Sequence, residues 1–449
     1  MPTYVAAVDC GATSVRVCRV DLTAPSLEPE VVHRVGHTPV VDDAGHLRWD
    51  WPTIVGAIID GLTACLDLGP LASIGVDTWA VDYGLLDEHN TLLSSPYAYR
   101  DHRTENYRDL VDAFGAAEMY RLNGLQLQPF NTIFQLAGHD PAELDRAARL
   151  LWLPELIVHH LTGQATTERT SAGSSGLIDV ATGDWSPVLL DLAGVDAGVL
   201  GPIEQAGRVV GEWRGVPVTL VGGHDTASAV AGMGAAAAGG SAFVASGTWM
   251  LAGVERDEPD TSEWARERNF TNEAGALDGF RFLRNVTGFW LFEQCRAAWA
   301  GRDVAAGGID ELLAAAEAAG PDVPLVDVDD ESLRAPDDML TAYTALAGLS
   351  LDAEPGIITR SIVESIVTRT AEVIEQVATV RDIDDIVLFG GAARMELLTR
   401  RLAEATGFDV RVGSAEAAAL GNAIVQGVAI GTFSSLDDGR ARISPTPSG

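Results

Sequence analysis

Residues 3–20 read TYVAAVDCGATSVRVCRV, and this stretch predicts how the fold begins. Thr3–Asp9 is an apolar run that ends in an acid, which predicts a buried strand. Cys10–Ser14 contains a glycine and small hydroxylated residues, which are typical of a turn, and Val15–Val20 predicts a second strand. The chain is therefore expected to start with a β-hairpin.

The tip of this hairpin has the composition of an anion-binding turn. After Asp9, the tip contains Gly11, Ala12, Thr13 and Ser14. A tight turn here would point successive backbone N–H groups outward, and such a concavity binds phosphate. The acid could hold a hydrated Mg²⁺ ion beside the phosphates, and Arg16 would add positive charge. An ordinary hairpin turn accounts for the same residues, because glycine and threonine are common in turns.

A second strand–turn–strand pattern occurs halfway along the chain. Ser241–Ser246 and Trp249–Val254 predict strands, and Gly247–Thr248 predicts the turn between them. Two such hairpins indicate a duplicated fold, although two unrelated hairpins would give the same pattern. Further on, Asp385–Phe389 predicts a strand that runs into Gly390–Gly391. Paired glycines let a backbone pass close to a flat ligand such as adenine, and a tight strand–helix turn is the alternative interpretation.

Helical and strand-like segments alternate through the rest of the chain, which predicts an α/β fold. Helices are expected at 51–66, 104–122, 143–161, 226–234, 352–379, 395–406 and 416–430, and further strands at 71–77, 218–221 and 410–412. A domain boundary is expected within 232–240. It would give an N-terminal domain of residues 1–234, a C-terminal domain of 235–436 and a polar, frayed tail of 437–449.

Length, charge and cysteine spacing restrict the class of protein. A chain of 449 residues can form two or three domains, each with its own core. Its net charge of −34 would repel nucleic acid and anionic membranes, so neither is an expected partner. No pair among the four cysteines has C-x-x-C spacing, which predicts buried thiols in a reducing cytoplasm and neither zinc nor disulfides. Met1–Cys10 lacks the basic start of a signal peptide, so cytoplasmic localisation is expected.

Lysine is absent, and all 30 cationic side chains are arginine. A nucleotide-binding lysine of the Walker-A or protein-kinase type is therefore impossible, as is a Schiff-base lysine. If the protein handles a nucleotide, backbone N–H groups, hydroxyls, arginine and a metal ion must bind its phosphates.

A candidate catalytic acid follows the strand expected at 218–221. The run His224-Asp225-Thr226-Ala227 opens a segment of small residues, so a substrate could approach closely. Asp225 could accept a proton from a hydroxyl as the hydroxyl attacks a phosphoryl group. An aspartate at the start of a helix is also a common N-cap, and pattern alone favours that role. The two roles are compatible.

Two segments have the side chains that a polyhydroxylated ligand needs. Residues 77–84 read DTWAVDYG and residues 99–104 read YRDHRT. Aromatic rings cover the C–H face of a sugar, while carboxylates and guanidinium groups bind its hydroxyls. A solvated loop with salt bridges is the alternative, and pattern alone does not decide between them.

The order of these motifs resembles that of the actin-like ATPases and, within them, the FGGY carbohydrate kinases. The resemblance extends from about residue 4 to about residue 431 and is closest to the rhamnulokinases of that family. It is carried by GVDTWAVDYGLLD at 75–87, YRDHRT at 99–104, GLQLQPFNT at 124–132, HDTASAV at 224–230, SGTW at 246–249, TNEAG at 271–275 and NVTGFW at 285–290.

The resemblance implies an α/β fold of two actin-like (ribonuclease H-like) domains, with mixed sheets flanked by helices and the active site in the interdomain cleft. Asp225 would be the general base, and Asp9 would lie near the metal ion, Mg²⁺. The sugar would contact Trp79, Ala80, Arg103, Phe130, Asn131 and His224. ATP would be bound by Ala12, Thr13, Ser14, Arg16, Thr248, Asn285, Glu293 and Gly391.

Three single positions and one three-residue stretch depart from the pattern of the family. Val15 and Ala80 stand where the family has glycines, so a side chain is added near the phosphates and near the sugar. Glu293 replaces a glutamine expected near the nucleotide and would bring an extra negative charge. Ala393-Arg394-Met395 replaces a more polar stretch. These departures bear more on the assignment of the sugar than on the assignment of the fold.

The activity implied by the resemblance is ATP-dependent phosphorylation of the primary hydroxyl of a ketose, L-rhamnulose, giving L-rhamnulose 1-phosphate. A kinase for another ketose or polyol, such as L-fuculose or xylulose, is an alternative. A non-catalytic sugar or nucleotide sensor on the same fold is another. A ribokinase-type enzyme is a third, and the hairpin at Asp9 argues against it. The expected partners are ATP and a small sugar, with the chain a monomer or a homodimer.

Overall fold

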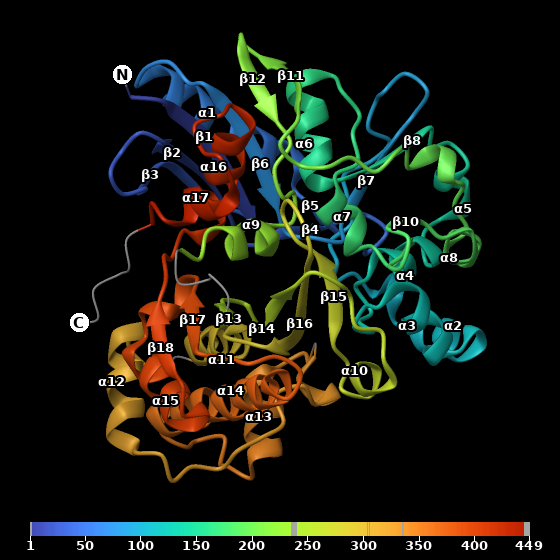
Figure 1. The fold of residues 1–449 in the computed structure, drawn as a ribbon. Helices are drawn as coiled ribbons and strands as arrows, with labels where there is room; N and C mark the ends of the chain where they lie inside the picture. Colours follow the sequence, from blue (N-terminus) through green and yellow to red (C-terminus); the bar gives the residue numbers. More distant parts are fainter. Residues whose placement is uncertain (1, 235–239, 303, 305, 335, 444–449) are drawn as a thin grey trace. The chain divides into compact units, whose positions relative to one another are not determined.

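The computed structural model describes residues 2–234, 240–302, 304, 306–334 and 336–443, and this part of the chain forms two compact units (Figure 1). Among the described residues, the first unit comprises 2–234, 255–282 and 416–443, and the second comprises 240–254 and 283–415.

The first unit is built on a six-stranded sheet with the strand order β11-β12-β6-β1-β2-β3. Its strands are β1 (Tyr4–Gly11), β2 (Ser14–Asp21), β3 (Pro29–Gly36), β6 (Ser73–Thr78), β11 (Val209–Trp213) and β12 (Val216–Thr219). β1 and β2 form the hairpin expected from the first residues, and β6 runs parallel to β1. Since β12 is parallel to β6, the carboxyl ends of β1, β6 and β12 meet at one edge of the sheet.

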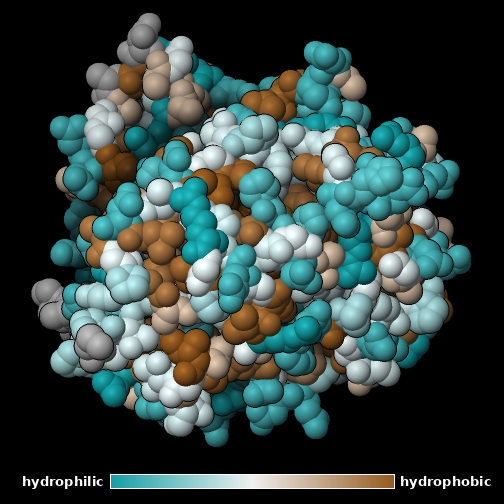
Figure 2. All heavy atoms as spheres, turned by 90° about the horizontal axis from the view of Figure 1, so that it is seen from above, coloured by the Kyte–Doolittle hydropathy of each residue, from teal (hydrophilic) through white to brown (hydrophobic). Residues whose placement is uncertain are grey.

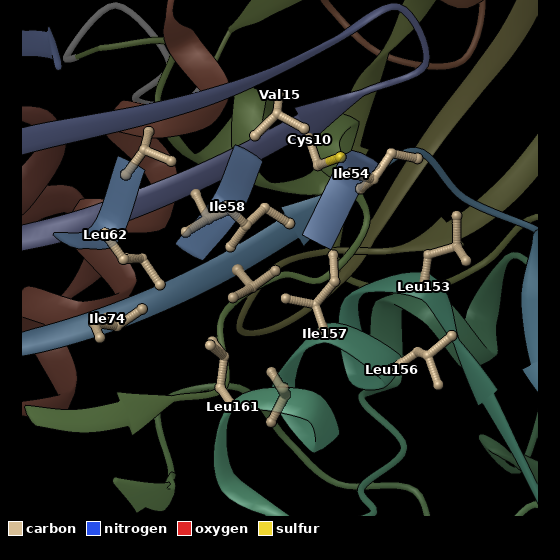
Figure 3. Close-up of a cluster of buried hydrophobic side chains, with 14 of the residues drawn as sticks. Cys10, Val15, Ile54, Ile58, Leu62, Ile74, Leu153, Leu156, Ile157 and Leu161 are labelled. Carbon is tan, nitrogen blue, oxygen red and sulfur yellow. The ribbon is translucent and has the colours of Figure 1, made fainter. Parts of the chain in front are cut away.

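One face of this sheet packs against helices α1 (Trp51–Asp67) and α6 (Leu153–Thr162). Figure 3 shows Cys10 and Val15 of the hairpin directed into a cluster with Ile58 of α1 and Ile157 of α6. All four side chains are at most 2% exposed. A fully buried side chain of this kind contributes about 1.5–3 kcal/mol through the hydrophobic effect.

The opposite face packs against α16 (Ala417–Ala429), which comes from the far end of the chain. Val5 and Val20 of the hairpin lie in one buried cluster with Leu420 and Ile424 of this helix. Side chains alternate between the two faces of a strand, so Asp9 points to the same face as Val5. This alternation puts the acid of the hairpin on the α16 side.

Helix α9 (Asp225–Ala231) crosses α16 at two glycines. A Cβ on Gly421 would lie 1.7 Å from the carbonyl oxygen of Ser228, and a Cβ on Gly232 would lie 2.0 Å from that of Ala417. Neither position therefore tolerates a side chain without movement of a backbone.

The rest of the first unit includes a second buried core and small two-stranded sheets. Its helices are α2 (Tyr107–Phe114), α3 (Ala116–Asn123), α4 (Thr132–Ala137), α5 (Pro141–Leu144), α7 (Arg169–Gly173), α8 (Pro187–Ala193), α10 (Glu263–Glu267) and α17 (Leu436–Arg440). Its further strands are β4 (Pro39–Val41), β5 (Leu47–Trp49), β7 (Tyr83–Leu86), β8 (Arg149–Trp152), β9 (Ile178–Asp179), β10 (Asp184–Trp185) and β15 (Thr271–Ala274).

Two expected helices differ from the structure. The segment 104–122 is interrupted at Gly115, whose φ of 99° ends α2 and starts α3. The segment 143–161 contains strand β8, which pairs antiparallel with β7. Periodicity could not separate the apolar run of β8 from the helix that follows it, because both are buried.

The second sheet has the strand order β15-β16-β14-β13-β17-β18. Its remaining strands are β13 (Ser241–Ser246), β14 (Trp249–Arg256), β16 (Phe280–Thr287), β17 (Asp385–Phe389) and β18 (Asp409–Val412). The helices of the second unit are α11 (Trp290–Gly301), α12 (Ile309–Ala319), α13 (Met339–Ala347), α14 (Pro355–Ala378) and α15 (Glu396–Thr406). β13 and β14 form the second expected hairpin, and β13 runs parallel to β17.

The division of the chain differs from a single cut within 232–240. Residues 255–282 and 416–443 belong with the first unit, and 235–239 lie outside the described residues. Part of the expected tail forms α17, in which Arg440 is buried. Its guanidinium donates to the carbonyl oxygens of Val230 and Ala231 and pairs with Glu255 at 2.9 Å. This arginine therefore ties the end of the chain to the last turn of α9.

The outer surface mixes polar and apolar residues. On the face drawn in Figure 2, apolar side chains occur in several small groups with hydrophilic residues between them. Among the described residues, no helix combines the length and hydrophobicity needed to cross a membrane. All four cysteines are free and buried, which confirms the expectation of buried thiols.

Candidate active site

Three of the sequence signals meet at the carboxyl ends of β1, β6 and β12 in the first unit. The backbone N–H of Thr78 donates to the carbonyl oxygen of Gly223 at 2.8 Å, and that of Trp79 donates to Cys10 at 3.2 Å. Thr78 also forms an isolated parallel bridge with His224. The hairpin at Asp9, the segment after Asp77 and the His224–Asp225 pair are thus held together by backbone hydrogen bonds.

The hairpin tip is closed where Gly11 pairs with Ser14, which leaves Ala12 and Thr13 at the turn. His37 reinforces the turn, because its backbone N–H donates to Thr13 and its Nε2 lies 3.0 Å from the carbonyl oxygen of Gly11. Burial lowers the pKa of His37, which favours the neutral ring beside the turn.

Val15, a departure from the family pattern, does not fill this turn. Its side chain is 1% exposed and packs in the core shared with α1 and α6 (Figure 3). By strand alternation, Val15 points away from the face that carries Asp9 and Arg16. The added side chain therefore contributes to the core and does not project on the side of Asp9 and Arg16.

Asp9 and Arg16 are paired on the α16 face of the hairpin. Arg16 Nη2 lies 3.0 Å from Asp9 Oδ2, and Arg16 Nη1 lies 2.8 Å from Glu416 Oε2. Burial raises the pKa of Asp9 to about 6, against the opposing effect of the Arg16 guanidinium. The guanidinium of Arg16 is therefore present at the hairpin, as expected, and it forms ion pairs with two carboxylates.

Asp77 is a second buried acid at this edge, and sequence reasoning gave it no separate role. It lies opposite Asp9 in the β1–β6 register, and its Oδ2 accepts a 2.6 Å hydrogen bond from Asn422 of α16. Burial raises its pKa well above the usual range. The signal that identifies it is an acid at the end of an apolar strand, as at Asp9.

The backbone before Asp225 is fixed by groups at the start of α7. The N–H of Gly223 donates to Glu168 Oε2 at 3.0 Å, and the N–H of His224 donates to Thr170 Oγ1 at 3.0 Å. A Cβ on Gly223 would lie 2.9 Å from Ser171 Oγ, so glycine permits this close approach. These contacts therefore fix the backbone that leads into α9.

Asp225 is the accessible acid of the group. Its side chain is 29% exposed, whereas that of Asp9 is 1% exposed. Its Oδ1 lies 3.0 Å from His224 Nδ1 and accepts a 3.2 Å hydrogen bond from Thr226 Oγ1. Among the described residues, these contacts use Oδ1 and leave Oδ2 for a ligand. The N-cap of α9 is His224, whose Nδ1 lies 3.3 Å from the Thr226 backbone N, so Asp225 is not the cap.

His224 connects Asp225 to two charged residues that sequence reasoning missed. Its Nε2 lies 3.3 Å from Glu273 Oε2, and Arg281 Nη2 lies 3.0 Å from the same oxygen. All three side chains are at most 9% exposed. Glu273 occurs in the TNEAG segment that supports the family resemblance, but no local pattern indicates its contact with His224.

The expected sugar residue Trp79 lies in a cluster of aromatic rings. Its indole is 4.3 Å from that of Trp49, and both indole N–H groups donate to Asp82 Oδ2, at 2.9 and 2.7 Å. The backbone N–H of Tyr99 donates to the same oxygen at 3.1 Å. Ala80, which follows Trp79, is half-buried. Asp82 thus fixes the rings around this segment.

The other expected sugar residues make mostly internal contacts. The Phe130 ring lies 6.0 Å from that of Tyr99, and Asn131 Oδ1 accepts from the Gln128 N–H at 2.9 Å. The guanidinium of Arg103 lies 3.8 Å from the centre of the Tyr97 ring and donates to Gln135. The Arg103 side chain is only 4% exposed, so its contacts favour a structural role.

In the second unit, the turn at Thr248 is held against the start of α11. The N–H of Phe289 donates to the Gly247 carbonyl oxygen at 3.0 Å, and the N–H of Trp290 donates to Thr248 at 3.3 Å. Asn285 of β16 is half-buried. The expected residues Thr248 and Glu293 are therefore linked through this end of α11.

The paired glycines lie beside the same hairpin. Ser246 Oγ donates to Phe389 at 2.8 Å, and Gly390 has a φ of 93° with its Cβ position 2.5 Å from the Ser246 carbonyl oxygen. Gly391 is exposed, and a Cβ there would meet no atom within 4 Å. Gly390 is required by the close contact, while Gly391 leaves open space.

Two further departures lie in this unit. The Glu293 carboxylate is 52% exposed and lies 2.6 Å from Arg296 Nη1, one turn further along α11. Its added negative charge is therefore balanced locally. Met395 is the N-cap of α15 and is half-buried, so it shapes the start of that helix.

Two family models match consecutive segments of the chain. The N-terminal domain of the FGGY family of carbohydrate kinases matches residues 4–238, and its C-terminal domain matches 242–430. The rhamnulokinase of Bacteroides thetaiotaomicron is 34% identical over 98% of this chain and 93% of the relative. The rhamnulokinase of Enterococcus faecalis is 32% identical, over 98% and 92%.

Solved structures of sugar and polyol kinases have the same fold. The gluconate kinase of Lactobacillus acidophilus superimposes with a TM-score of 0.81 at 17% identity, over 100% of this chain and 93% of that structure. The glycerol kinase of Plasmodium falciparum with ADP gives a TM-score of 0.78 at 16% identity, over 99% and 93%. The chain belongs to the FGGY family of carbohydrate kinases.

Proposed function

We propose that this kinase transfers the γ-phosphoryl group of ATP to the primary hydroxyl of L-rhamnulose, forming L-rhamnulose 1-phosphate and ADP. The choice of sugar is supported by identity of 31–34% to rhamnulokinases over nearly the whole chain. The reaction chemistry is supported by Asp225, a partly exposed carboxylate with one oxygen that has no hydrogen-bond partner among the described residues, at the same sheet edge as the β1–β2 hairpin.

In this proposal, Asp225 Oδ2 accepts the proton of the attacking hydroxyl. The sugar oxygen forms a bond to the γ-phosphorus as its O–H bond breaks. The bond from phosphorus to the bridging oxygen breaks, and its electron pair stays on ADP. The backbone of Thr78, which precedes Trp79, is hydrogen-bonded to Gly223, two residues before this acid, and this proximity supports a place for the sugar near Trp79 and Ala80.

The phosphate contacts are proposed to come from the backbone of Ala12, Thr13 and Ser14, with Arg16 as the nearby cation. Without lysine, these groups are the ones available on the hairpin. In the second unit, Thr248, Asn285, Glu293 and Gly391 are the proposed nucleotide contacts. Open space at Gly391 supports the approach of a flat base.

A Mg²⁺ ion fits the residues of the hairpin. Asp9 is buried, and its Oδ2 makes no hydrogen bond among the described residues besides its ion pair with Arg16. Carboxylate oxygens are preferred ligands of Mg²⁺, so Asp9 would hold the ion. When bound, the ion supplies positive charge that offsets the charge of the phosphates.

A coupled assay of ADP release with Mg-ATP tests the function. The purified chain is mixed in turn with L-rhamnulose, L-fuculose, D-xylulose, L-xylulose, glycerol and gluconate. We expect kcat/KM for L-rhamnulose to exceed that for every other compound by at least tenfold. A higher value for another compound would replace the proposed sugar, and binding of ATP and sugar without ADP release would indicate a sensor.

A further inference from the structure

The His224 ring lies between two carboxylates, and we propose that it acts as an imidazolium that fixes the candidate base. In this arrangement, His224 donates to Asp225 Oδ1 and to Glu273, so that Oδ2 of Asp225 is directed to the substrate. Glu273 is then a positioning residue that acts through His224. The inference rests on the proposed role of Asp225.

Both ring nitrogens lie within ion-pair distance of a carboxylate oxygen. Nδ1 lies 3.0 Å from Asp225 Oδ1, and Nε2 lies 3.3 Å from Glu273 Oε2. A neutral imidazole has one N–H, so it can satisfy only one of two ionised carboxylates, whereas an imidazolium satisfies both. The ring is buried, which makes an unsatisfied contact costly.

One contact opposes this assignment. The backbone N–H of Thr226 lies 3.3 Å from Nδ1, and it would donate to a neutral ring that carries its proton on Nε2. The carboxylate of Asp225 is closer to the same nitrogen, at 3.0 Å. A hydrogen bond from an imidazolium N–H to a carboxylate is stronger than one from a neutral amide N–H to a neutral imidazole. The imidazolium is therefore favoured.

The charged groups around His224 act in both directions. Asp225 on α9 and Glu273 on β15 favour the charged ring, while Arg281 on β16 opposes it. At the N-cap of α7, the carboxylate of Glu168 contacts the adjacent Gly223 N–H, and on β6 the neighbour of His224 is the uncharged Thr78. The pKa of His224 is raised overall, because its hydrogen bonds to the two carboxylates outweigh burial and Arg281.

Arg281 prevents Glu273 from being an isolated buried charge. Its guanidinium is 1% exposed, lies 3.0 Å from Glu273 Oε2 and donates through Nε to the carbonyl oxygen of Ala274 at 3.1 Å. The pKa of Glu273 is lowered, because Arg281 and His224 outweigh its desolvation. Glu273 therefore remains ionised and can stabilise a cation on His224.

The test compares wild-type enzyme with Glu273→Gln, which keeps the shape of the side chain and removes its charge. Loss of a negative charge 3.3 Å from Nε2 should lower the pKa of His224, so the ring becomes neutral at lower pH. We expect the alkaline limb of the kcat–pH profile to move down by about one pH unit, with the sugar KM changed less than about threefold. An unchanged profile overturns the proposal.

Glu143→Gln is the matched control. Glu143 Oε2 lies 3.0 Å from His139 Nε2, so this variant also removes a carboxylate from a buried imidazole of the first unit. Among the described residues, the His139 ring contacts Tyr83 and Tyr97 and none of the proposed site residues, so the kcat–pH profile should be unchanged. If Glu143→Gln shifts the kcat–pH profile as far as Glu273→Gln does, the shift reflects the loss of any negative charge from the protein. The proposed role of Glu273 beside His224 would then be wrong.

A second measurement requires no activity and reads the protonation of the ring in the wild-type protein. Nitrogen-15 NMR of the wild-type imidazoles, with the His224 signals assigned by their loss in His224→Asn, reports the protonation of each ring nitrogen without substrate. We expect both nitrogens of His224 to be protonated at pH 7. A neutral ring at that pH overturns the proposal even if the chain is a kinase. Absence of kinase activity would overturn the proposed function and leave this measurement valid.

Discussion

Acidic residues at the strand ends of the first unit differ mainly in their access to solvent. Asp9 and Asp77 are at most 1% exposed and have partners on α16 or on the hairpin, whereas the Asp225 side chain is 29% exposed. A base must contact its substrate, so accessibility selects Asp225 among these acids. The buried pair is better suited to binding an ion or to holding the sheet against α16.

Asp225→Asn should remove the proton acceptor while keeping the fold. We expect kcat to fall by about 10²–10⁴-fold, the usual range for loss of general acid–base catalysis. The Tm should be unchanged within about 2 °C. The measurement is ADP release with the preferred sugar, together with thermal unfolding. Asp112→Asn, at an exposed position on α2, is the control and should have wild-type turnover. Near-normal turnover of Asp225→Asn would contradict the proposed mechanism.

Glu155 and Glu168 form a buried pair behind the candidate site, and they should make stability depend on pH. The Glu168 N–H donates to Glu155 Oε1 at 2.9 Å. Burial, with the neighbouring Glu168, raises the pKa of Glu155 from 4.5 to about 8. The folded state therefore binds a proton that the unfolded state has released, so stability decreases as pH rises from about 4.5 through about 8.

Glu155→Gln mimics the protonated side chain and should remove much of this dependence. We expect its Tm, relative to wild type, to increase steadily between pH 5 and pH 8, by about 2–4 °C for each kcal/mol gained. Glu88→Gln, at a position 83% exposed, should show no such trend. A constant difference in Tm across this range would mean that Glu155 is ionised in the folded protein.

At the scale of elements, the crossing of α9 and α16 positions the candidate site. α16 carries Asn422, which binds Asp77, and it follows Glu416, which binds Arg16. α9 begins at Asp225. The close approach at Gly232 and Gly421 therefore sets how these groups lie relative to one another within the first unit.

Gly421→Ala should separate the two helices. Its Cβ would lie 1.7 Å from the Ser228 carbonyl oxygen, so a backbone must move, and overpacking of this kind costs about 1–3 kcal/mol or more. We expect a lower Tm and a reduced kcat. Gly56→Ala in α1 is the control, since its Cβ would meet nothing within 4 Å, and it should be neutral or stabilise by about 0.5–1 kcal/mol. Equal stability of the two variants in thermal unfolding would contradict the close packing.

At the scale of the whole molecule, the first unit is assembled from distant parts of the sequence. α16 covers one face of its central sheet, and its residues Asn422 and Gln426 are fully buried there. A fragment that ends at residue 234 would lack this helix and the strand that carries Glu273. It would expose the apolar face formed by Val5 and Val20.

We therefore expect residues 1–234 not to fold by themselves, whereas the full chain unfolds cooperatively. Circular dichroism during thermal unfolding and limited proteolysis of the two purified proteins give the comparison. A cooperative transition and protease resistance of the fragment similar to those of the full chain would show that residues 255–282 and 416–443 are dispensable. The fragment tests the structural division directly, because the expected sequence boundary lies at its end.

Local pattern identified the elements that depend on local chemistry. Both hairpins, the strand before Gly390–Gly391 and the small-residue helix after Asp225 were predicted, because alternation, glycine and apolar runs are readable in short windows. Strand β8 and the break at Gly115 were missed, because a buried strand next to a buried helix has no distinguishing period, and a helical pattern can continue across a glycine.

The sequence by itself determined the family, the two hairpins and the acids at the strand ends, since these depend on residue type and order along the chain. Tertiary structure alone decided that His224 contacts Glu273, that Asp77 binds Asn422 and that Val15 points into the core. The physical reason is that contacts across 49 or 345 positions depend on how helices and strands pack, and no local pattern records that packing.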